Sequence, residues 1–319
     1  MNGRKLEIIM YHYVRNLKNS RYPNIKGLDS ALFKRQIQYL KKRYNFISTE
    51  QVIHAIKTGD TLPANSALLT FDDGYLDHYT TVFPVLMEYD IKGFFAMPGK
   101  ILKEEKMLDV NKIHYILANQ NILVVKERLI QLLDYYRGQE FDIPSIEDLT
   151  KRLAKPNRFD DGNTILVKRI LQSELEEHLR NLLTKQLFSE FVSDNEKAFV
   201  SELYLSWDQI RLMKKCGMHF GIHGYEHHWF DKLPPAIYEK DIQNALEIFE
   251  DVININEWVF CYPYGASSQQ VIDFSKKSGS IAGVTTKARV ADLDKDDPML
   301  LPRFDTNDYP PICSTKKEY

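Results

Sequence analysis

The sequence predicts an α/β protein built on a parallel sheet or barrel and interrupted once by a long helical insertion. Short apolar runs alternate with amphipathic helical patterns over about residues 5–100 and 201–310, which is typical of such folds. Between them, the apolar residues recur almost only at helical spacing. We therefore predict a discontinuous barrel domain, residues 1–102 and 201–319. Residues 103–200 are predicted to form the helical insertion, which serves as a lid or a dimerisation element.

The elements before the insertion follow from apolar runs and helix-capping residues. Ser48 is a candidate N-cap, because its hydroxyl can accept a hydrogen bond from the first turn of a helix. The run 67–71 is largely apolar and predicts a buried strand that stops at two aspartates. In order, the expected elements are strands at 7–11, 67–71 and 93–97, and helices over 32–40, from Ser48, and over 82–87.

Capping patterns also mark elements inside and after the insertion. Ser173 with Glu176, and Ser206 with Gln209, have the spacing of a capping box and predict two helix starts. Pro235 suits the first turn of another helix. The alternation then resumes, with strands expected at 218–222, 258–262, 281–285 and finally 300–304, and a helix over 271–277.

Composition excludes several classes of protein. The chain has 319 residues and a formal net charge of −2 with dispersed charges, which argues against nucleic acid as a partner. Cys216, Cys261 and Cys313 form neither an even disulfide framework nor the close pairs of a zinc–thiolate site. Neither a signal peptide nor an apolar run of membrane-spanning length is recognisable. We therefore expect a cytoplasmic protein without an integral membrane segment.

Unusual polar groups follow three of the predicted strands. Asp72 and Asp73 follow the strand at 67–71, and His223 and His227 follow the strand at 218–222. Tyr264 lies in a Pro-Tyr-Gly turn after the strand at 258–262. In a parallel barrel the carboxyl ends of the strands face one mouth, where loops build active sites. Taken singly, the aspartates are also compatible with an ordinary turn and the histidines with core or surface packing. Their shared position favours one functional site.

One carboxylate and two imidazoles suit a divalent transition metal, with open positions for water and substrate. The two histidines are four residues apart, so both can face one ion. Zn²⁺ is the ion we expect, acting as a Lewis acid that lowers the pKa of bound water. Adjacent aspartates point in different directions, so one can bind the ion while the other reaches a water molecule.

The Asp-Asp turn, the His-x-x-x-His loop and the Tyr-Pro-Tyr-Gly segment, in this order, resemble the polysaccharide deacetylase family. This is carbohydrate esterase family four, with its NodB-like homology domain. The resemblance implies a distorted, incomplete (β/α)7 barrel and one metal ion held by Asp73, His223 and His227. By position, Asp72 matches the family's catalytic base. Tyr264 matches the residue whose backbone N–H helps to hold the oxyanion.

The chain departs from the family pattern in three places. Gly224 stands where a Ser or Thr is usual, and Cys261 replaces an Arg that normally orients the base. Arg303 lies near a late strand end and is a candidate to supply that charge, although it also fits a surface arginine. The late histidine of the family, its usual general acid, has no counterpart. His12, at the end of the first strand, is our candidate substitute; the alternative is a buried histidine bonded to backbone. His78 and His114 are weaker candidates for the same role.

The predicted activity is hydrolysis of an N-acetyl group on an amino sugar. The expected substrate is a nucleotide-linked, lipid-linked or oligosaccharide sugar, such as a cytoplasmic precursor of a surface polysaccharide. Two alternatives stay open: a deformylase or other amide hydrolase on the same scaffold, and a carbohydrate-binding protein whose active site has decayed. Aromatic residues near the predicted mouth are further candidates for stacking on a sugar ring. These residues are Tyr11, Tyr75, Tyr225, Trp229 and Tyr262.

Overall fold

The computed structural model describes residues 3–139 and 141–313. The chain divides into two compact units. The first consists of Met1–Asn16, Gly27–Lys106 and Val200–Tyr319, and the second of Leu17–Lys26 and Met107–Phe199. The second unit thus holds the helical stretch and also a short segment from near the N-terminus, which the sequence analysis assigned to the barrel.

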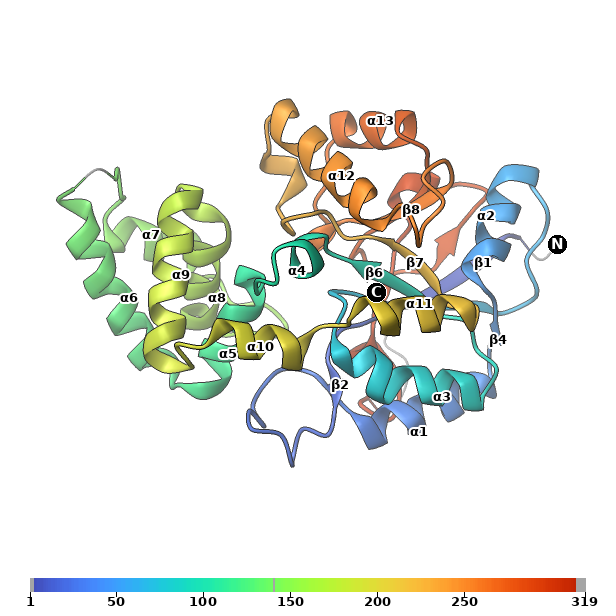
Figure 1. The fold of residues 1–319 in the computed structure, drawn as a ribbon, viewed down its shortest axis with the longest axis horizontal. Helices are drawn as coiled ribbons and strands as arrows, with labels where there is room; N and C mark the ends of the chain where they lie inside the picture. The colour runs from blue at the N-terminus through green and yellow to red at the C-terminus, as the bar shows by residue number, and fades with distance from the viewer. Residues whose placement is uncertain (1–2, 140, 314–319) are drawn as a thin grey trace. The chain divides into compact units, whose positions relative to one another are not determined.

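The first unit is built on a mostly parallel sheet that is curled into an open half-barrel (Figure 1). Its strands are β1 (Lys5–Tyr11), β4 (Asn45–Phe46), β5 (Ser66–Phe71), β6 (Phe94–Met97), β7 (His219–Ile222), β8 (Trp258–Cys261), β9 (Ser280–Val284), β10 (Ala291–Asp292) and β11 (Phe304–Asp305). The main path runs β10-β1-β5-β6-β7-β8-β9, and only the β10–β1 pairing is antiparallel. The predicted α/β class and distorted barrel are confirmed.

The order of strands brings distant segments together. β6 and β7 are paired in register, Phe94 with His219 and Met97 with Ile222, although the whole helical stretch separates them in sequence. Consequently the carboxyl ends of β5, β6, β7 and β8 are neighbours in one sheet. A small separate sheet pairs β2 (Val14–Arg15) with β3 (Leu28–Asp29).

Helices of the first unit lie around the outside of this sheet (Figure 1). They are α1 (Ser30–Lys41), α2 (Thr49–Thr58), α3 (Phe83–Glu88), α4 (Lys100–Lys103), α11 (Trp207–Lys215), α12 (Pro235–Phe249) and α13 (Gln269–Lys277). The predicted capping boxes of Ser48 with Gln51 and of Ser206 with Gln209 are both present. Pro235 is the first residue of α12, as expected. α2 contributes Val52 to a core cluster that also contains Leu6, Leu68 and Ala96 from the strands.

The second unit is helical. It contains α5 (Asp109–Asn119), α6 (Ile122–Arg137), α7 (Ile146–Leu153), α8 (Gly162–Arg169), α9 (Glu177–Phe191) and the start of α10 (Glu196–Leu203). The predicted capping box of Ser173 and Glu176 is wrong. A π-helical turn, Ile170–Glu174, continues α8 and includes Ser173, so its hydroxyl does not lie at a helix start. Glu176 is itself the N-cap of α9, without a side-chain bond.

Among the described residues, none of the helices has the length and apolar character needed to cross a membrane.

Candidate active site and metal centre

The three polar clusters expected at strand ends meet at one edge of the sheet. The hydrogen bonding of the strands continues past their ends, because Asp72 N–H donates to Tyr11 O at 2.9 Å and His223 N–H donates to Met97 O at 2.8 Å. These bonds fix the turn after β5 and the loop after β7 relative to the barrel. The side chains of both segments are therefore placed by the core rather than by a free loop.

Asp73, His223 and His227 form a buried group suited to a metal ion. Oδ1 of Asp73 lies 3.3 Å from Nε2 of His223 and 3.3 Å from Nε2 of His227. Ligand atoms bound tetrahedrally at zinc distances lie roughly 3.3–3.5 Å apart, so the spacing fits the ion. Oδ1 is also buried without a hydrogen-bond partner in the described part of the chain. Such an atom is costly unless it binds something.

Several residues at or near this group have a positive φ, which is strained for residues other than glycine. Of the six non-glycine residues with positive φ in the described chain, three are Asp73 (74°), His227 (62°) and Tyr264 (59°). A residue with a side chain rarely adopts this conformation, and it persists only where the surroundings impose it. All three belong to the predicted site, which supports a functional role for the turns that carry them.

Further hydrogen bonds hold the side chains of His223 and Asp73 in place. His223 donates from Nδ1 to the carbonyl of Cys261 at 2.6 Å, which leaves the lone pair of Nε2 directed at Asp73. The Tyr75 hydroxyl donates to Oδ2 of Asp73 at 2.5 Å. The carbonyl orients the His223 ring and raises the basicity of its Nε2, and the hydroxyl restrains the Asp73 carboxylate. The role of Tyr75 was not foreseen, although it stands only two residues after Asp73.

The loop between the two histidines is organised by Asp241 of α12. Its carboxylate accepts hydrogen bonds from the N–H groups of Tyr225 at 2.6 Å and Glu226 at 2.9 Å. Gly224 has φ +71°, and a Cβ there would lie 2.9 Å from Oδ1 of Asp241. The space that a Ser or Thr would need is thus filled, which explains the glycine. A carboxylate on the apolar face of α12 was the available sequence signal for Asp241.

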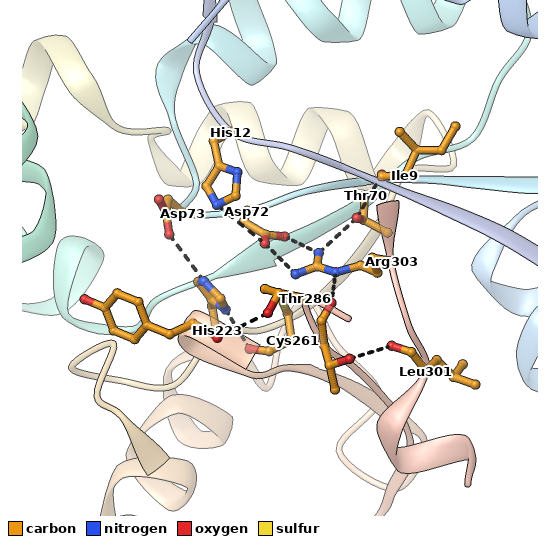
Figure 2. Close-up of polar contacts among 12 residues, drawn as sticks. Ile9, His12, Thr70, Asp72, Asp73, His223, Cys261, Thr286, Leu301 and Arg303 are labelled. Carbon is orange, nitrogen blue, oxygen red and sulfur yellow. Dashed lines mark hydrogen bonds and ion pairs between the residues drawn. The ribbon is translucent and has the colours of Figure 1, made fainter. Parts of the chain in front are cut away.

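Arg303 lies on the proposed base, Asp72 (Figure 2). Its guanidinium donates to both carboxylate oxygens, each at 2.8 Å, and both side chains are nearly inaccessible. Further bonds to Thr70 Oγ1 at 3.0 Å and Thr285 O at 2.8 Å fix the arginine. Burial opposes ionisation of Asp72, but the Arg303 charge outweighs it and holds the pKa of Asp72 below its ordinary value. Arg303 therefore supplies the positive charge beside Asp72, which the thiol of Cys261 cannot supply.

His12, the main candidate for the acid, lies close to Asp72 (Figure 2). Its Nε2 lies 3.8 Å from Oδ2 of Asp72, and its side chain is 38% exposed, so it is not a buried structural histidine. His78, a weaker candidate, is fully buried and donates to the carbonyl of His12 at 3.1 Å. It therefore supports the backbone of His12. His114, another weak candidate, belongs to α5 of the second unit.

Tyr264, in the loop after β8, packs against the Asp-His-His group through His227. Its ring meets the ring of His227 edge-on, with centroids 4.7 Å apart, and stacks on Trp229 at 4.2 Å. The side chain of Tyr264 is thus next to one of the two histidines of the Asp-His-His group. Three of the aromatic residues expected at the mouth do not face a sugar, because they are buried in the core: Tyr11, Tyr75 and Tyr262.

The sequence matches a family model over more than half of its length. The model describes polysaccharide deacetylases and matches residues 59–123 and 158–282. The match includes the turn after β5 and the loops after β7 and β8, which carry Asp72, Asp73, His223, His227 and Tyr264.

Curated relatives match over shorter stretches. The poly-β-1,6-N-acetyl-D-glucosamine N-deacetylase of Escherichia coli K12 is 28% identical over 122 residues, which are 36% of this chain and 18% of that protein. YxkH of Bacillus subtilis, named as a polysaccharide deacetylase, is 31% identical over 113 residues, 33% of this chain and 38% of that protein. The matches thus span less than two fifths of either relative.

Solved structures share the fold. The Streptococcus pyogenes deacetylase PplD, in complex with acetate, superposes with a TM-score of 0.56 at 17% identity, covering 95% of this chain and 92% of that one. IcaB from Ammonifex degensii gives 0.55 at 18% identity, with 95% and 91% covered. Together with the family match and the Asp-His-His group at the strand ends, these findings identify the chain as a member of the polysaccharide deacetylase family.

Proposed function

We propose that this chain is a zinc-dependent N-deacetylase that hydrolyses the acetamide group of an N-acetylated amino sugar. The observation that carries the proposal is the buried Oδ1 of Asp73, 3.3 Å from the Nε2 atoms of His223 and His227. The neighbouring Asp72, paired with Arg303, lies beside this group. A metal ion held by the triad would supply Lewis acidity to the acetamide carbonyl and to water.

Asp72 is the proposed general base. It takes the proton from the attacking water while the water's oxygen forms a bond to the acetamide carbon. The two bonds from Arg303 keep the carboxylate ionised and fix its direction, so no reorientation is needed during the reaction. The charge that the family usually draws from the position of Cys261 is supplied here by Arg303. This intact pairing argues against a decayed site.

Tyr264 and His12 are proposed to serve the later steps. The backbone N–H of Tyr264, whose ring contacts that of His227, is the proposed donor to the oxyanion of the tetrahedral intermediate. His12 gives a proton to the departing amine, and acetate and the free amino sugar result. The partial exposure of His12 supports this role, since a proton donor must recover its proton from solvent in every cycle.

N-acetylglucosamine is the substrate unit that we propose, since the E. coli relative is named for deacetylation of its β-1,6-linked polymer. Whether the unit is carried by a nucleotide, a lipid or an oligosaccharide stays a prediction, as does a cytoplasmic precursor role. The formamide alternative differs only in the acyl group. Product analysis therefore separates the two.

The test uses β-1,6-linked N-acetylglucosamine oligomers and nucleotide-linked N-acetylglucosamine, with released acetate and formate measured separately. We expect acetate. Asp72→Asn should keep zinc and lose about 10²–10⁴-fold in kcat, the range for a general base. The matched control is Asp77→Asn, which removes a carboxylate from another largely buried arginine pair, with Arg15 at 2.7 Å, and should retain turnover. Formate release, or full activity in Asp72→Asn, would contradict the proposal.

A further inference from the structure

The two oxygens of the Asp73 carboxylate have different surroundings. Oδ1 faces His223 and His227. Oδ2 accepts a hydrogen bond from the Tyr75 hydroxyl at 2.5 Å. Asp73 is 2% exposed and Tyr75 is fully buried, so water does not compete for this bond. Because an ionised carboxylate only accepts, the phenol must be the donor.

The ring of Tyr75 is held firmly in place. It stacks on Tyr13 with a centroid distance of 4.0 Å and an interplanar angle of 20°. It is also nearly parallel to the ring of Tyr204, with a centroid distance of 6.3 Å and an interplanar angle of 10°. The backbone is fixed as well, by a bridge between Tyr75 and Tyr204 and by the bond from Leu205 N–H to Gly74 O at 2.9 Å. The hydroxyl therefore has little freedom to leave Asp73.

We propose that Tyr75 is a positioning residue of the metal centre, whose hydroxyl occupies Oδ2 of Asp73 so that the carboxylate presents only Oδ1 to the metal ion. This inference rests on the proposed metal site. A charge-assisted bond between buried groups is short and strong, so it restricts the rotation of the carboxylate. Without it, Asp73 can turn or offer both oxygens, which changes the affinity for the ion and the number of donors around it.

The experiment compares Tyr75→Phe with Tyr11→Phe in the full chain, freed of metal with a chelator and then titrated with Zn²⁺ and Co²⁺. Tyr11 is the matched control, since it is equally buried but its hydroxyl bonds to Gln36 at 2.8 Å. We expect Tyr75→Phe to raise the Kd for Zn²⁺ by about 10–100-fold, the usual effect of losing a partner of a metal ligand. Its Co²⁺ absorption spectrum should also change, whereas Tyr11→Phe should match the wild type in both.

A second variant, Tyr75→Leu, separates the hydroxyl from the packing of the ring. If Tyr75→Phe binds Zn²⁺ like the wild type and only Tyr75→Leu loses affinity, ring packing is what matters and the inference is wrong. Circular dichroism of the metal-free variants checks that each is folded. If the wild type itself binds no metal, the proposed function fails instead, so the two failures are distinguishable.

Discussion

Replacing Arg303 with methionine should destabilise the barrel unit far more than replacing a partly exposed arginine that also pairs with one carboxylate through two bonds. Methionine is similar in length but leaves the Asp72 carboxylate without its two bonds of 2.8 Å. Asp72 is 1% exposed, so water does not replace the lost partner. Breaking a buried ion pair in this way costs about 3–5 kcal/mol. In a unit of this size, that lowers Tm by roughly 6–20 °C.

The matched control is Arg289→Met. Arg289 also pairs with one carboxylate through two bonds, to Asp296 at 2.6 and 2.7 Å, but its side chain is 36% exposed. Ion pairs exposed to solvent contribute about 0–1 kcal/mol. The Tm of both variants is measured by thermal unfolding in the presence of a chelator, with near-ultraviolet circular dichroism as the signal. An Arg303→Met variant that unfolds no earlier than Arg289→Met would refute the reasoning.

The pH dependence of the Arg303 variant should differ in sign from that of the wild type. In the wild type the pKa of Asp72 is lowered, so ionised Asp72 stabilises the fold above the unfolded pKa of about 4 and this contribution is lost as pH falls. Without Arg303, burial becomes the largest influence and raises the pKa of Asp72, opposed only by the smaller effects of His223 and His12. The variant should then lose stability as pH rises, and adding Asp72→Asn should restore part of it above pH 5. If Asp72→Asn makes Arg303→Met still less stable, the uncompensated charge is not the cause.

Three further outcomes are expected. Gly224→Ala should lower the free energy of unfolding clearly more than Gly59→Ala. Both glycines have positive φ, which costs about 1–2 kcal/mol for alanine, but only a Cβ at Gly224 meets a neighbour, Asp241 at 2.9 Å. Urea denaturation compares the two variants. Glu50→Gln should remove part of the acid sensitivity between about pH 4.5 and 2, since the hydrogen bond with His219 lowers the pKa of Glu50 to about 2 despite its partial burial; the difference between urea midpoints at several pH values measures this. Chelation should abolish acetate release and Zn²⁺ should restore it; activity that persists in the chelator, with metal shown to be absent, would exclude the metal mechanism.

Local patterns were sufficient for the main elements of the barrel. The buried strand at β5 and the helix starts at Ser48 and Ser206 follow from apolar runs and capping spacing, which act over a few residues. The grouping of Asp73 with His223 also followed, because polar residues at parallel strand ends share one edge. The capping box at Ser173 failed for a local reason too, since a π-helical turn absorbed the residue.

The sequence pattern does not determine contacts that depend on tertiary packing. The spacing of Tyr75 does not show whether its hydroxyl bonds to Asp73 or its ring stacks on a sugar. The difference lies in the burial of Tyr75 and its packing against Tyr13 and Tyr204. Similarly, the pairing of Asp72 with Arg303 joins positions 231 residues apart. Its alternative, a surface arginine, was excluded only by the fold.

Diffraction from crystals grown with zinc, measured at the zinc absorption edge, tests the central claim most directly. The account predicts one strong anomalous peak, about 2.0–2.2 Å from Oδ1 of Asp73 and from Nε2 of both His223 and His227. Zinc found only elsewhere on the protein, with these three side chains still packed against one another, would contradict it.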